Sequence, residues 1–589
     1  MVRALRLLAL SLVVGCSGAA GPAVDPAPGA GTGAPPGAAG DAAAAPERVT
    51  IAVVGTSDVH GHISMLPYLG GSVDNLEASG QVDAVVLLDG GDMFQGTLES
   101  NLNEGASVVD AYNLLGYAGA AIGNHEFDFG PAGDAPVPSG PEDDPRGALK
   151  ARAAQARFPL LAANLIDAAT GERVRWPGVH ASALIERAGV PIGIIGVSTI
   201  DTPRTTTSRN FAGLAMAPLV DSIAAEAAAL RQKGARVVLV AAHAGGRCTE
   251  LDDPRDLSSC DPEQEIFQVA RALPPGAVDV IVAGHTHRAV AHEVAGIAII
   301  QSWAKAVAFG RVDLVLDRDR RVVERRIHPP RYLCGERREP PDLDAGEPCP
   351  AGEYAGKPVA PDPEVAALVA RYHAAARAVR ERKLGVVVES TITRAHSVES
   401  PLGNLFADLM RAARPGADVA ITNGGGLRAD LPPGELTYGA LYEAMPFDNR
   451  FATVRLTGAQ LARLIARNLA GGHGVLSVSG VQVTARCAGG QLQVTLTRRR
   501  GKRRVKVRDR ERLTLVTSDF LASGGDGMLA ELDLPPGAVV LHDDGPTIRD
   551  AIAEVLARRR TPLGGDDRAL YDPAAPRMSY PGKRPVQCQ

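Results

Sequence analysis

The sequence has few aromatic residues: Phe, Trp and Tyr together make up 4% of its 589 positions. The core must therefore be built from Ala, Val, Leu and Ile, and the 45% hydrophobic content supplies ample material for it. The sequence also lacks a basic excess, because 62 Lys and Arg stand against 67 Asp and Glu, for a formal net charge of −5. This overall balance does not indicate a nucleic-acid partner, and we expect none. Charged residues at 22% exclude a mainly disordered or fibrous chain.

Several functional motifs are also missing. The sequence contains no GxSxG motif, no reactive-cysteine arrangement and no P-loop, so a serine or cysteine nucleophile is not expected. It contains no CxxC spacing, which argues against a metal site built from thiolates. The apolar run near the N-terminus spans about 12 residues, fewer than the roughly 20 that a transmembrane helix needs, and no other segment is long and apolar enough.

The N-terminus has the pattern of an export signal. Two arginines precede the apolar run Leu7–Val14, and small residues follow it. The stretch that ends at Cys16 resembles a bacterial lipobox, in which the cysteine becomes the lipidated first residue; an ordinary cleavable signal is the alternative. Residues 17–47 are mostly Gly, Ala and Pro, a composition typical of a flexible tether. We therefore predict a signal peptide at 1–16, a tether at 17–47 and a lipid-anchored envelope protein, at the outer membrane if the cell has one, otherwise periplasmic or secreted.

The remaining six cysteines are an even number, which suits disulfides in an exported protein. Two of them lie close together in a polar loop, two flank another loop, and two are left over. We predict the disulfides Cys248–Cys260, Cys334–Cys349 and Cys487–Cys588, although other pairings are possible in principle.

Short apolar runs recur from residue 48 to about 330, and each is followed by a loop and often by a helical stretch. Continuous runs of this length are typical of strands buried on both faces in an α/β fold. The predicted strands are Val49–Val54, Ala84–Leu88, Gly119–Ile122, Phe158–Ala162, Ile192–Val197, Val237–Ala241 and Val278–Val282.

The composition changes after residue 330. Residues 331–383 combine a segment rich in Pro, Gly and charge with a helix expected at Pro363–Lys383, and we predict that they link two domains. The second domain, 384–589, mixes both element types. Its predicted strands are Val386–Ile392, Val419–Ile421 and Leu513–Val516, and its predicted helices are Leu402–Ala412, Ala459–Ala470 and Ile548–Arg558.

Polar residues follow five of the predicted strands of the first domain. They stand at 56–62, 89–92, 123–128, 243 and 284–287. Because ligands bind at the carboxyl ends of strands in open α/β sheets, these loops should meet at one edge. Carboxylate, imidazole and amide donors together suit Zn, Mn, Fe or Co. They are too many for one ion, so we predict two divalent ions about 3.5–4 Å apart. Asp92, which follows a two-glycine turn, is the natural bridge between them.

The order DxH, GGD, GNHExD, a later His and GHxH resembles the metallophosphoesterase signature. The longer stretches GDMFQGT (91–97) and GNHEFDFG (123–130) are similar to the 5′-nucleotidase/UDP-sugar hydrolase family. The resemblance covers residues 48–330 and 384–558. It implies an α/β fold in which a four-layer α/β/β/α metallophosphoesterase domain precedes a smaller α+β 5′-nucleotidase C-terminal domain.

The same resemblance implies roles for individual residues. One ion would be held by Asp58, His60, Asp92 and His287, and the other by Asp92, Asn124, His243 and His285. His125 would stabilise the transition state or leaving group, with Asp128 orienting it, while a hydroxide generated at the ions attacks phosphorus. His62 also matches the signature but is given no ligand role.

Three motifs of the second domain complete the resemblance: NGGGLR (423–428), MPFDN (445–449) and FLASGGDG (520–527). Taken alone, such motifs are more often a plain glycine turn or a phenylalanine in the core. The resemblance implies that they bind the substrate through Asn423, Arg428, Phe447, Phe520 and Asp526, with the base between the two Phe, once the domains rotate together. Two positions depart from the family pattern. Asp519 stands where the family has Asn, and His396 stands where many members have a phosphate-binding Arg; Arg394 is a candidate substitute.

We therefore expect an extracytoplasmic, metal-dependent phosphoester hydrolase, a 5′-nucleotidase acting on a small-molecule nucleotide. The alternatives are a UDP-sugar hydrolase, a 2′,3′-cyclic-nucleotide phosphodiesterase or a relative with a sulfur substrate. A further alternative is a non-catalytic surface lipoprotein that binds nucleotides. The basic run 498–504 either binds polyanions or, as we expect, forms the solvated tip of a hairpin between Leu492–Leu496 and Val505–Val507.

Overall fold

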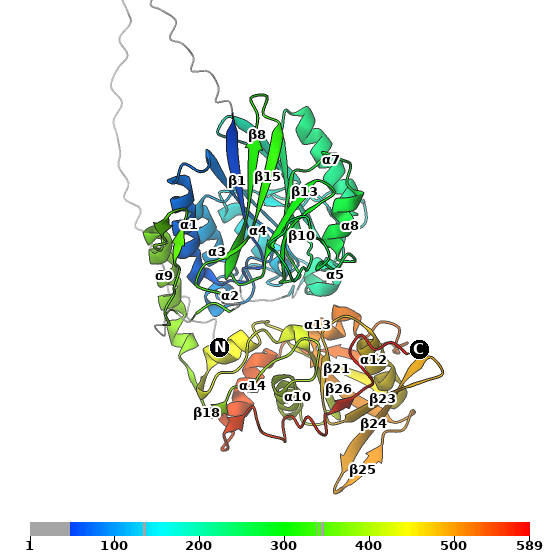
Figure 1. The fold of residues 1–589 in the computed structure, drawn as a ribbon. Helices are drawn as coiled ribbons and strands as arrows, with labels where there is room; N and C mark the ends of the chain where they lie inside the picture. Colours follow the sequence, from blue (N-terminus) through cyan, green and yellow to red (C-terminus); the bar gives the residue numbers. More distant parts are fainter. Residues whose placement is uncertain are drawn as a thin grey trace, which may run out of the picture.

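The computed structural model describes residues 48–588, except 134–136, 139, 337–338, 342 and 344–346. The predicted signal peptide and tether, with Cys16, lie outside the described residues. The chain forms two domains, one above the other in Figure 1, and helix α9 (Pro363–Arg380) runs along one side between them. Within the described ranges, no helix is long and apolar enough to cross a membrane.

Two sheets lie face to face in the N-terminal domain. The first has the order β15-β14-β1-β2-β3-β4-β6 and the second the order β12-β13-β11-β10-β8-β7. The strands of the first are β1 (Val49–Thr56), β2 (Ala84–Asp89), β3 (Gly119–Ala121), β4 (Leu160–Leu161), β6 (Val179–His180), β14 (Ala308–Leu316) and β15 (Val322–Tyr332). Those of the second are β7 (Ser182–Arg187), β8 (Val190–Ser198), β10 (Val237–His243), β11 (Val280–Ala283), β12 (Ala289–Val294) and β13 (Ile297–Ser302).

Apolar side chains fill the space between the two sheets, because strands such as β1 and β10 carry Val, Ile or Leu toward both faces. Helices cover the two outer faces. The first sheet is covered by α1 (Leu66–Glu77), α3 (Ala106–Leu115), α4 (Gly147–Gln155) and part of α9, and the second by α7 (Leu219–Gln232) and α8 (Glu265–Ala272). The predicted four-layer α/β/β/α architecture is confirmed (Figure 1).

The C-terminal domain is α+β, as expected. Its central sheet has the order β22 (Leu476–Ser479), β19 (Val419–Asn423), β26 (Arg512–Ser518), β21 (Phe451–Thr457) and β27 (Val539–Leu541). Helices α10 (Pro401–Ala413), α11 (Tyr438–Ala444), α12 (Gly458–Ala470) and α14 (Ile548–Ala557) pack against this and two smaller sheets. A capping box fixes the start of α12, because Thr457 accepts from the backbone of Gln460 and the Gln460 side chain accepts from the backbone of Thr457.

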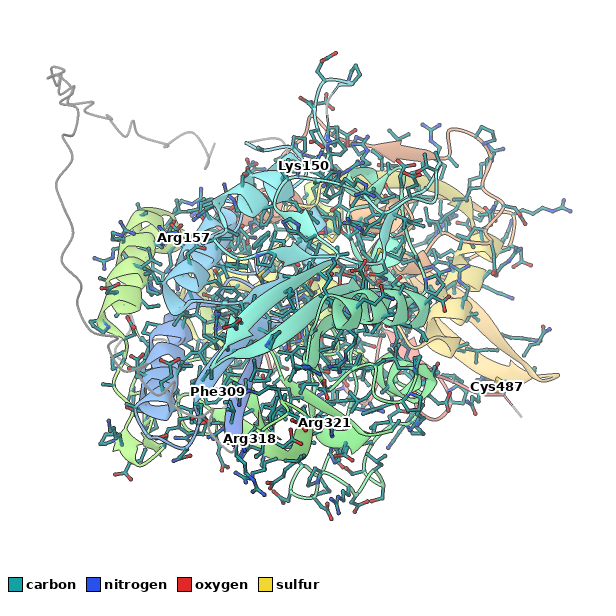
Figure 2. All side chains as sticks on the ribbon, turned by 90° about the horizontal axis from the view of Figure 1, so that it is seen from above. Lys150, Arg157, Phe309, Arg318, Arg321 and Cys487 are labelled. Carbon is teal, nitrogen blue, oxygen red and sulfur yellow. A yellow bond between two sulfur atoms is a disulfide. The ribbon has the colours of Figure 1, made fainter. Side chains whose placement is uncertain are left out.

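All three predicted disulfides are present, Cys248–Cys260, Cys334–Cys349 and Cys487–Cys588. The third joins strand β23 (Gln482–Ala488) to the C-terminal segment; Cys487 is labelled in Figure 2. Three expectations about elements need correction. The strand expected at Phe158–Ala162 pairs only at Leu160–Leu161. The helix expected at Pro363–Lys383 ends at Arg380, and β18 (Lys383–Ser390) begins soon after it. The antiparallel pairs β12–β13 and β14–β15 were not predicted.

Candidate active site

The predicted donor residues meet at one edge of the two sheets. Strands β1, β2 and β3 are parallel to one another, as are β8, β10 and β11, so the loops that follow them open on the same side. Two groups of donors form there, with ligand atoms within 4.8 Å of one another: Asp58, His60, Asp92 and His287, and Asp92, His243 and His285. The shared member is Asp92, the residue that the sequence indicated as a bridge.

Asn124, the remaining predicted metal ligand, completes the second group. Its Oδ1 lies 3.0 Å from His243 Nε2, and that nitrogen lies 3.1 Å from Asp92 Oδ2. Carboxylate, imidazole and amide donors at this spacing fit a pair of borderline divalent cations. His62 is in neither group.

Backbone carbonyls orient two of the histidines toward the donor groups. His60 Nδ1 donates to the carbonyl of Gln95 at 2.8 Å, and His243 Nδ1 donates to the carbonyl of Gly90 at 3.0 Å. In each ring the proton on Nδ1 leaves Nε2 as the basic nitrogen that faces the cluster. Hydrogen bonds of this kind fix the tautomer of metal-binding histidines.

Five donor residues have left-handed backbone conformations: Asp58, His60, Asp92, His285 and His287, with φ between 49° and 76°. Non-glycine residues rarely adopt this region, and each instance costs of order 1 kcal/mol or more. The surrounding turns therefore hold these side chains at the cluster against a local preference. Gly123 permits the close packing, because a Cβ atom there would lie 2.2 Å from Asp92 Oδ1.

Glu126 supports the site, and the sequence analysis gave it no role. Its carboxylate accepts hydrogen bonds from the backbone N–H groups of Asp92 (3.0 Å), Met93 (2.7 Å) and Gly123 (2.6 Å). It thereby joins the loop after β2 to the loop after β3. Its place in the GNHE motif was the only sequence signal for this function.

Burial and mutual charge shift the pKa values of the cluster in opposite directions. Burial alone would raise the pKa of Asp92, but the charges of His243 and His125 outweigh it and hold the pKa well below the usual range. Burial would likewise lower the pKa of His243, but Asp92 beside it raises that pKa to about 10. For Asp58, burial raises the pKa to about 7. The carboxylates and imidazoles of the site are thus electrostatically interdependent.

His125 and Asp128 form the predicted pair. His125 Nδ1 donates to Asp128 Oδ2 at 2.6 Å, and Asp128 Oδ1 accepts from Thr206 Oγ1 at 3.0 Å. The other ring nitrogen of His125 accepts from Arg428 Nη2 of the C-terminal domain at 3.1 Å. Burial lowers the pKa of His125, but Asp92 and Asp128 outweigh it and raise the pKa above its ordinary value. The ring is therefore oriented by Asp128 and faces the second domain.

The residues predicted to bind substrate line one cleft of about 740 Å³ between the domains, together with His125, His285 and His287. Its lining includes all five: Asn423, Arg428, Phe447, Phe520 and Asp526. Asn423 Nδ2 donates to Asp526 Oδ2 at 2.7 Å, which holds two of the predicted substrate-binding residues together. The ring of Phe447 lies 5.5 Å from that of His125, and Arg428 stands 5.2 Å above it. Phe520 instead packs on the backbone of Gly525.

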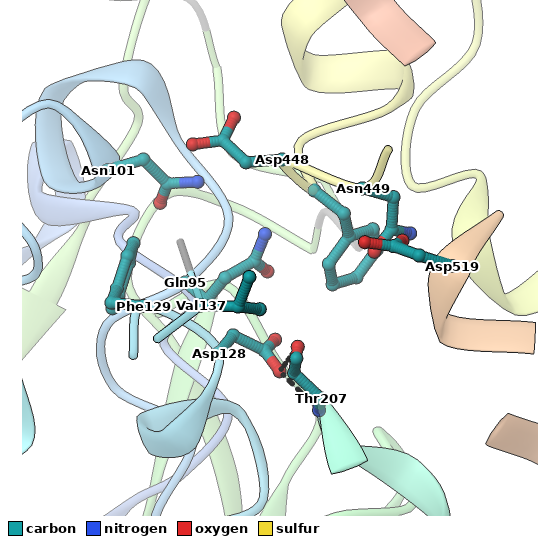
Figure 3. A pocket seen from close by; sticks show the side chains of 10 residues that line it. Gln95, Asn101, Asp128, Phe129, Val137, Thr207, Asp448, Asn449 and Asp519 are labelled. Atoms are coloured by element: carbon teal, nitrogen blue, oxygen red, sulfur yellow. Dashed lines mark hydrogen bonds between the residues drawn. The ribbon is translucent and has the colours of Figure 1, made fainter. Parts of the chain in front are cut away.

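A much smaller cavity of about 30 Å³ lies beside the His125–Asp128 pair (Figure 3). Gln95, Asn101 and Asp128 line it from the N-terminal domain, and Asn449 and Asp519 line it from the C-terminal domain. Next to it Asn101 Nδ2 donates to the carbonyl of Pro446 at 3.0 Å. The loop that carries Phe447 is therefore joined to the N-terminal domain at the catalytic edge.

The two departures from the family pattern lie in these cavities. His396 and Arg394 both line the large cleft, and Arg394 lies 3.8 Å from Glu339. Asp519 lines the small cavity, where Asp519 Oδ1 accepts from the backbone N–H groups of Phe520 and Arg450. Burial raises the pKa of Asp519 from its ordinary value of 3.8 to about 6.

Comparison with known proteins agrees with this geometry. Residues 51–289 match the calcineurin-like phosphoesterase family, and residues 379–531 match the 5′-nucleotidase, C-terminal domain. The chain thus combines a calcineurin-like phosphoesterase domain with a 5′-nucleotidase C-terminal domain. This combination assigns it to a class of metal-dependent phosphoester hydrolases.

Three curated relatives of this hydrolase show how far the likeness extends. Protein UshA of Escherichia coli is 26% identical over 446 residues, 70% of this chain and 74% of that protein. Cell wall protein Lmo0130 of Listeria monocytogenes is 24% identical over 538 residues, 83% of this chain and 65% of that protein. Endonuclease YhcR of Bacillus subtilis is 26% identical over 460 residues, but the chain spans only 34% of its length.

Among solved structures, a 5′-nucleotidase precursor from Thermus thermophilus superposes with a TM-score of 0.65. The match covers 86% of this chain and 96% of that one at 22% sequence identity. At this identity the likeness establishes the shared fold.

Proposed function

We propose that this hydrolase releases phosphate from nucleoside 5′-phosphates. The observation that carries the proposal is the assembly of both halves of a nucleotide site in one cleft. The donor groups that share Asp92 face His125, and His125 in turn contacts Arg428 among the residues suited to hold a nucleoside. Phosphate chemistry and nucleoside recognition are thus adjacent in space.

The donor groups fit two divalent ions of the Zn, Mn, Fe or Co type. We assign one ion to Asp58, His60, Asp92 and His287, and the other to Asp92, Asn124, His243 and His285. Ions bound there would lower the pKa of a coordinated water and polarise the phosphoryl oxygens. Left-handed backbone at five of these residues supports the assignment, because such strain persists where function requires it.

The chain's own residues supply orientation and charge around the phosphate. Asp128 fixes the imidazole of His125 through Nδ1, so that Nε2 points to the position of the phosphoryl or leaving-group oxygen. Arg428 brings a guanidinium to the same place, and its planar fork matches two phosphate oxygens. A bound phosphate would lie between these two groups and accept hydrogen bonds from both.

The nucleoside would occupy the part of the cleft lined by the C-terminal domain. Asn423 and Asp526, already hydrogen bonded to each other, offer a donor and an acceptor to sugar hydroxyls. Phe520 and Phe447 offer aromatic faces for the base. The ring of Phe447 also packs against His125. It therefore lies nearer to the phosphate position than a residue that only stacks on the base would need to lie.

Hydrolysis of a substrate panel with Mn or Zn added tests this function. The panel is AMP, ATP, UDP-glucose, 2′,3′-cyclic AMP and bis-p-nitrophenyl phosphate, with released phosphate or alcohol measured for each. The proposal expects the highest kcat/KM for AMP. A higher value for UDP-glucose or for a diester would replace 5′-nucleotidase with one of the other activities of this class.

We also propose that the protein acts outside the cytoplasm and is anchored through Cys16. Three disulfides and the likeness to a cell wall protein support the location. Substitution Cys16→Ala should move the protein from the membrane fraction to the soluble fraction. A wild-type protein that is already soluble, with its N-terminus cut elsewhere, would contradict the anchor and leave the hydrolase unaffected.

A further inference from the structure

A strongly basic surface lies outside the active site, on a hairpin of the C-terminal domain. Strands β24 (Gln491–Arg500) and β25 (Arg503–Lys506) form this hairpin, which projects from the domain on the side away from the N-terminal domain (Figure 1). Residues 498–508 contain eight Lys or Arg and no Asp or Glu. The predicted hairpin tip is therefore confirmed, and its charge is concentrated there.

The register places like charges directly opposite each other. Arg499 pairs with Arg504, and Arg500 pairs with Arg503 on the next rung. Directly opposed like charges destabilise an antiparallel pair. Some charge is balanced, because Arg498 lies 3.0 Å from Asp418 and Arg500 lies 3.5 Å from Glu511. In the described part of the chain, no ion pair is present for Arg499, Arg503 or Arg504. Folding therefore brings these charges together at an electrostatic cost.

Both faces of the ribbon carry these cations. Directly opposed residues share a face, and successive residues alternate, so Arg499, Arg504 and Lys506 lie on one face and Arg500 and Arg503 on the other. Charged residues often protect an edge strand such as β25 from pairing with other chains. Here the cations also occupy β24 and the turn, where Lys502 follows a glycine. Edge protection does not account for this density.

We propose that the basic hairpin 498–508 is a nucleic-acid binding surface that holds the hydrolase on a phosphodiester chain. Two-stranded ribbons fit the major groove of a duplex, where phosphates line both walls and both faces of the ribbon find partners. A planar membrane would meet one face at a time, and the tip carries no apolar side chain to insert into a bilayer. Arginine forks suit phosphate oxygens. The net charge of −5 did not indicate this partner, because it sums over all 589 residues and does not show that cations are concentrated on one hairpin.

The proposal is independent of the active site and is tested by binding alone. Full-length protein is titrated into a fluorescent 24-base-pair duplex with phosphorothioate linkages, which resists hydrolysis, and anisotropy is recorded from 50 to 200 mM salt. Three variants are compared: R499Q/R504Q, R500Q/R503Q, and the quadruple variant. The control, R558Q/R559Q/R560Q/R568Q, removes the same charge from another surface of the same domain. Vesicles containing phosphatidylglycerol form a separate arm.

We expect the quadruple variant to bind the duplex at least about 10-fold more weakly than wild type at 50 mM salt. The plot of log K against log salt should become shallower by about 0.9 for each phosphate that the hairpin no longer neutralises. Each double variant should lose part of the affinity, because each removes one face. The melting temperature of the quadruple variant should not fall, since its opposed charges are gone, and AMP hydrolysis should stay at the wild-type rate.

Three results would overturn the proposal. The first is equal loss of duplex binding in the control variant, which would mean that only net charge matters. The second is binding to vesicles but not to the duplex, which would assign the hairpin to a membrane. The third is aggregation of the quadruple variant with unchanged duplex affinity, which would leave edge protection as the function of the cations.

Discussion

The guanidinium of Arg428 and the imidazole of His125 lie 3.1 Å apart, although 303 positions separate them in the sequence and each belongs to a different domain. The contact spans the two domains beside the donor groups and places a guanidinium and an imidazole where a phosphate would sit. Arg428 is half-buried there, and its partial removal from water lowers its pKa. A phosphate between the two side chains would therefore relieve a costly arrangement, which makes this contact a part of substrate recognition.

Substitution Arg428→Lys should lower kcat/KM for AMP by roughly 10- to 100-fold, because lysine keeps the charge but loses the fork that matches two phosphate oxygens. Arg394→Lys is the matched comparison, since Arg394 lines the same cleft but lies against Glu339. We expect Arg394→Lys to change kcat/KM for AMP by less than about 5-fold. Steady-state kinetics on AMP measures both, and equal losses would mean that Arg394 shares the phosphate-binding function.

Substitution His125→Asn should lower kcat by roughly 10²–10³, the scale expected when one transition-state donor is lost. Metal content should stay near that of the wild type, because the side chain of His125 is not in either donor group and its backbone N–H still donates to Asp92 Oδ1. Metal analysis of the purified variant beside its kinetics checks this. Loss of bound metal would show that His125 is a ligand.

Substitution Phe520→Ala should raise KM for AMP but leave hydrolysis of p-nitrophenyl phosphate nearly unchanged. Base–aromatic stacking is worth about 1–3 kcal/mol, so KM should rise by about 5- to 150-fold. Phe447→Ala should impair both substrates, because its ring packs against His125 as well as lining the cleft. Similar losses on both substrates for Phe520→Ala would assign Phe520 to the core.

Much of the fold followed from local patterns. Strands such as β1 and β10 are continuous apolar runs, and the polar residues after them met at one edge because parallel strands end together. The antiparallel strands were harder to predict, since β15 mixes apolar and charged residues without regular alternation and includes two prolines. Strand β4 is short because Pro159, which has no N–H to donate, precedes it.

The site was predictable to the extent that its residues stand in motifs. Asp92 and the histidines around it follow predicted strands, so the sequence could group them. Glu126 was missed because its place in the GNHE motif does not show that its carboxylate accepts from four backbone N–H groups. The contact of Arg428 with His125 depends on how two domains lie together, and local sequence patterns do not encode that position.

Substitution Asp519→Asn should stabilise the protein above pH 6 and have little effect near pH 4. Burial raises the pKa of Asp519 from 3.8 to about 6, so the folded state holds a proton in this range that the unfolded state releases. The free energy of unfolding of the wild type therefore falls as pH rises from about 4 to about 6. Asparagine lacks this penalty, and its Oδ1 can still accept from the backbone N–H groups of Phe520 and Arg450.

The Asp519→Asn variant should gain about 1 kcal/mol in free energy of unfolding at pH 7.5. The full pKa shift would imply roughly 3 kcal/mol, but Asp519 is only half-buried, so solvent reduces the effect. Thermal or urea unfolding at pH 4 and pH 7.5 measures it. The exposed Asp544→Asn variant corrects for the change in net charge. A gain that is equal at both pH values would show that burial of the Asp519 carboxylate is not its source.

Metal content and AMP hydrolysis, measured together on the wild type and Asp92→Ala, test the central claim most directly. Asp92 is the one donor that both groups share, so its loss should weaken both sites at once. The account predicts two divalent ions per wild-type chain, activity that a chelator abolishes, and an Asp92→Ala protein that is folded but lacks both ions and hydrolysis. An Asp92→Ala variant with normal metal content and full activity, or a wild type that hydrolyses AMP unchanged in chelator, would contradict it.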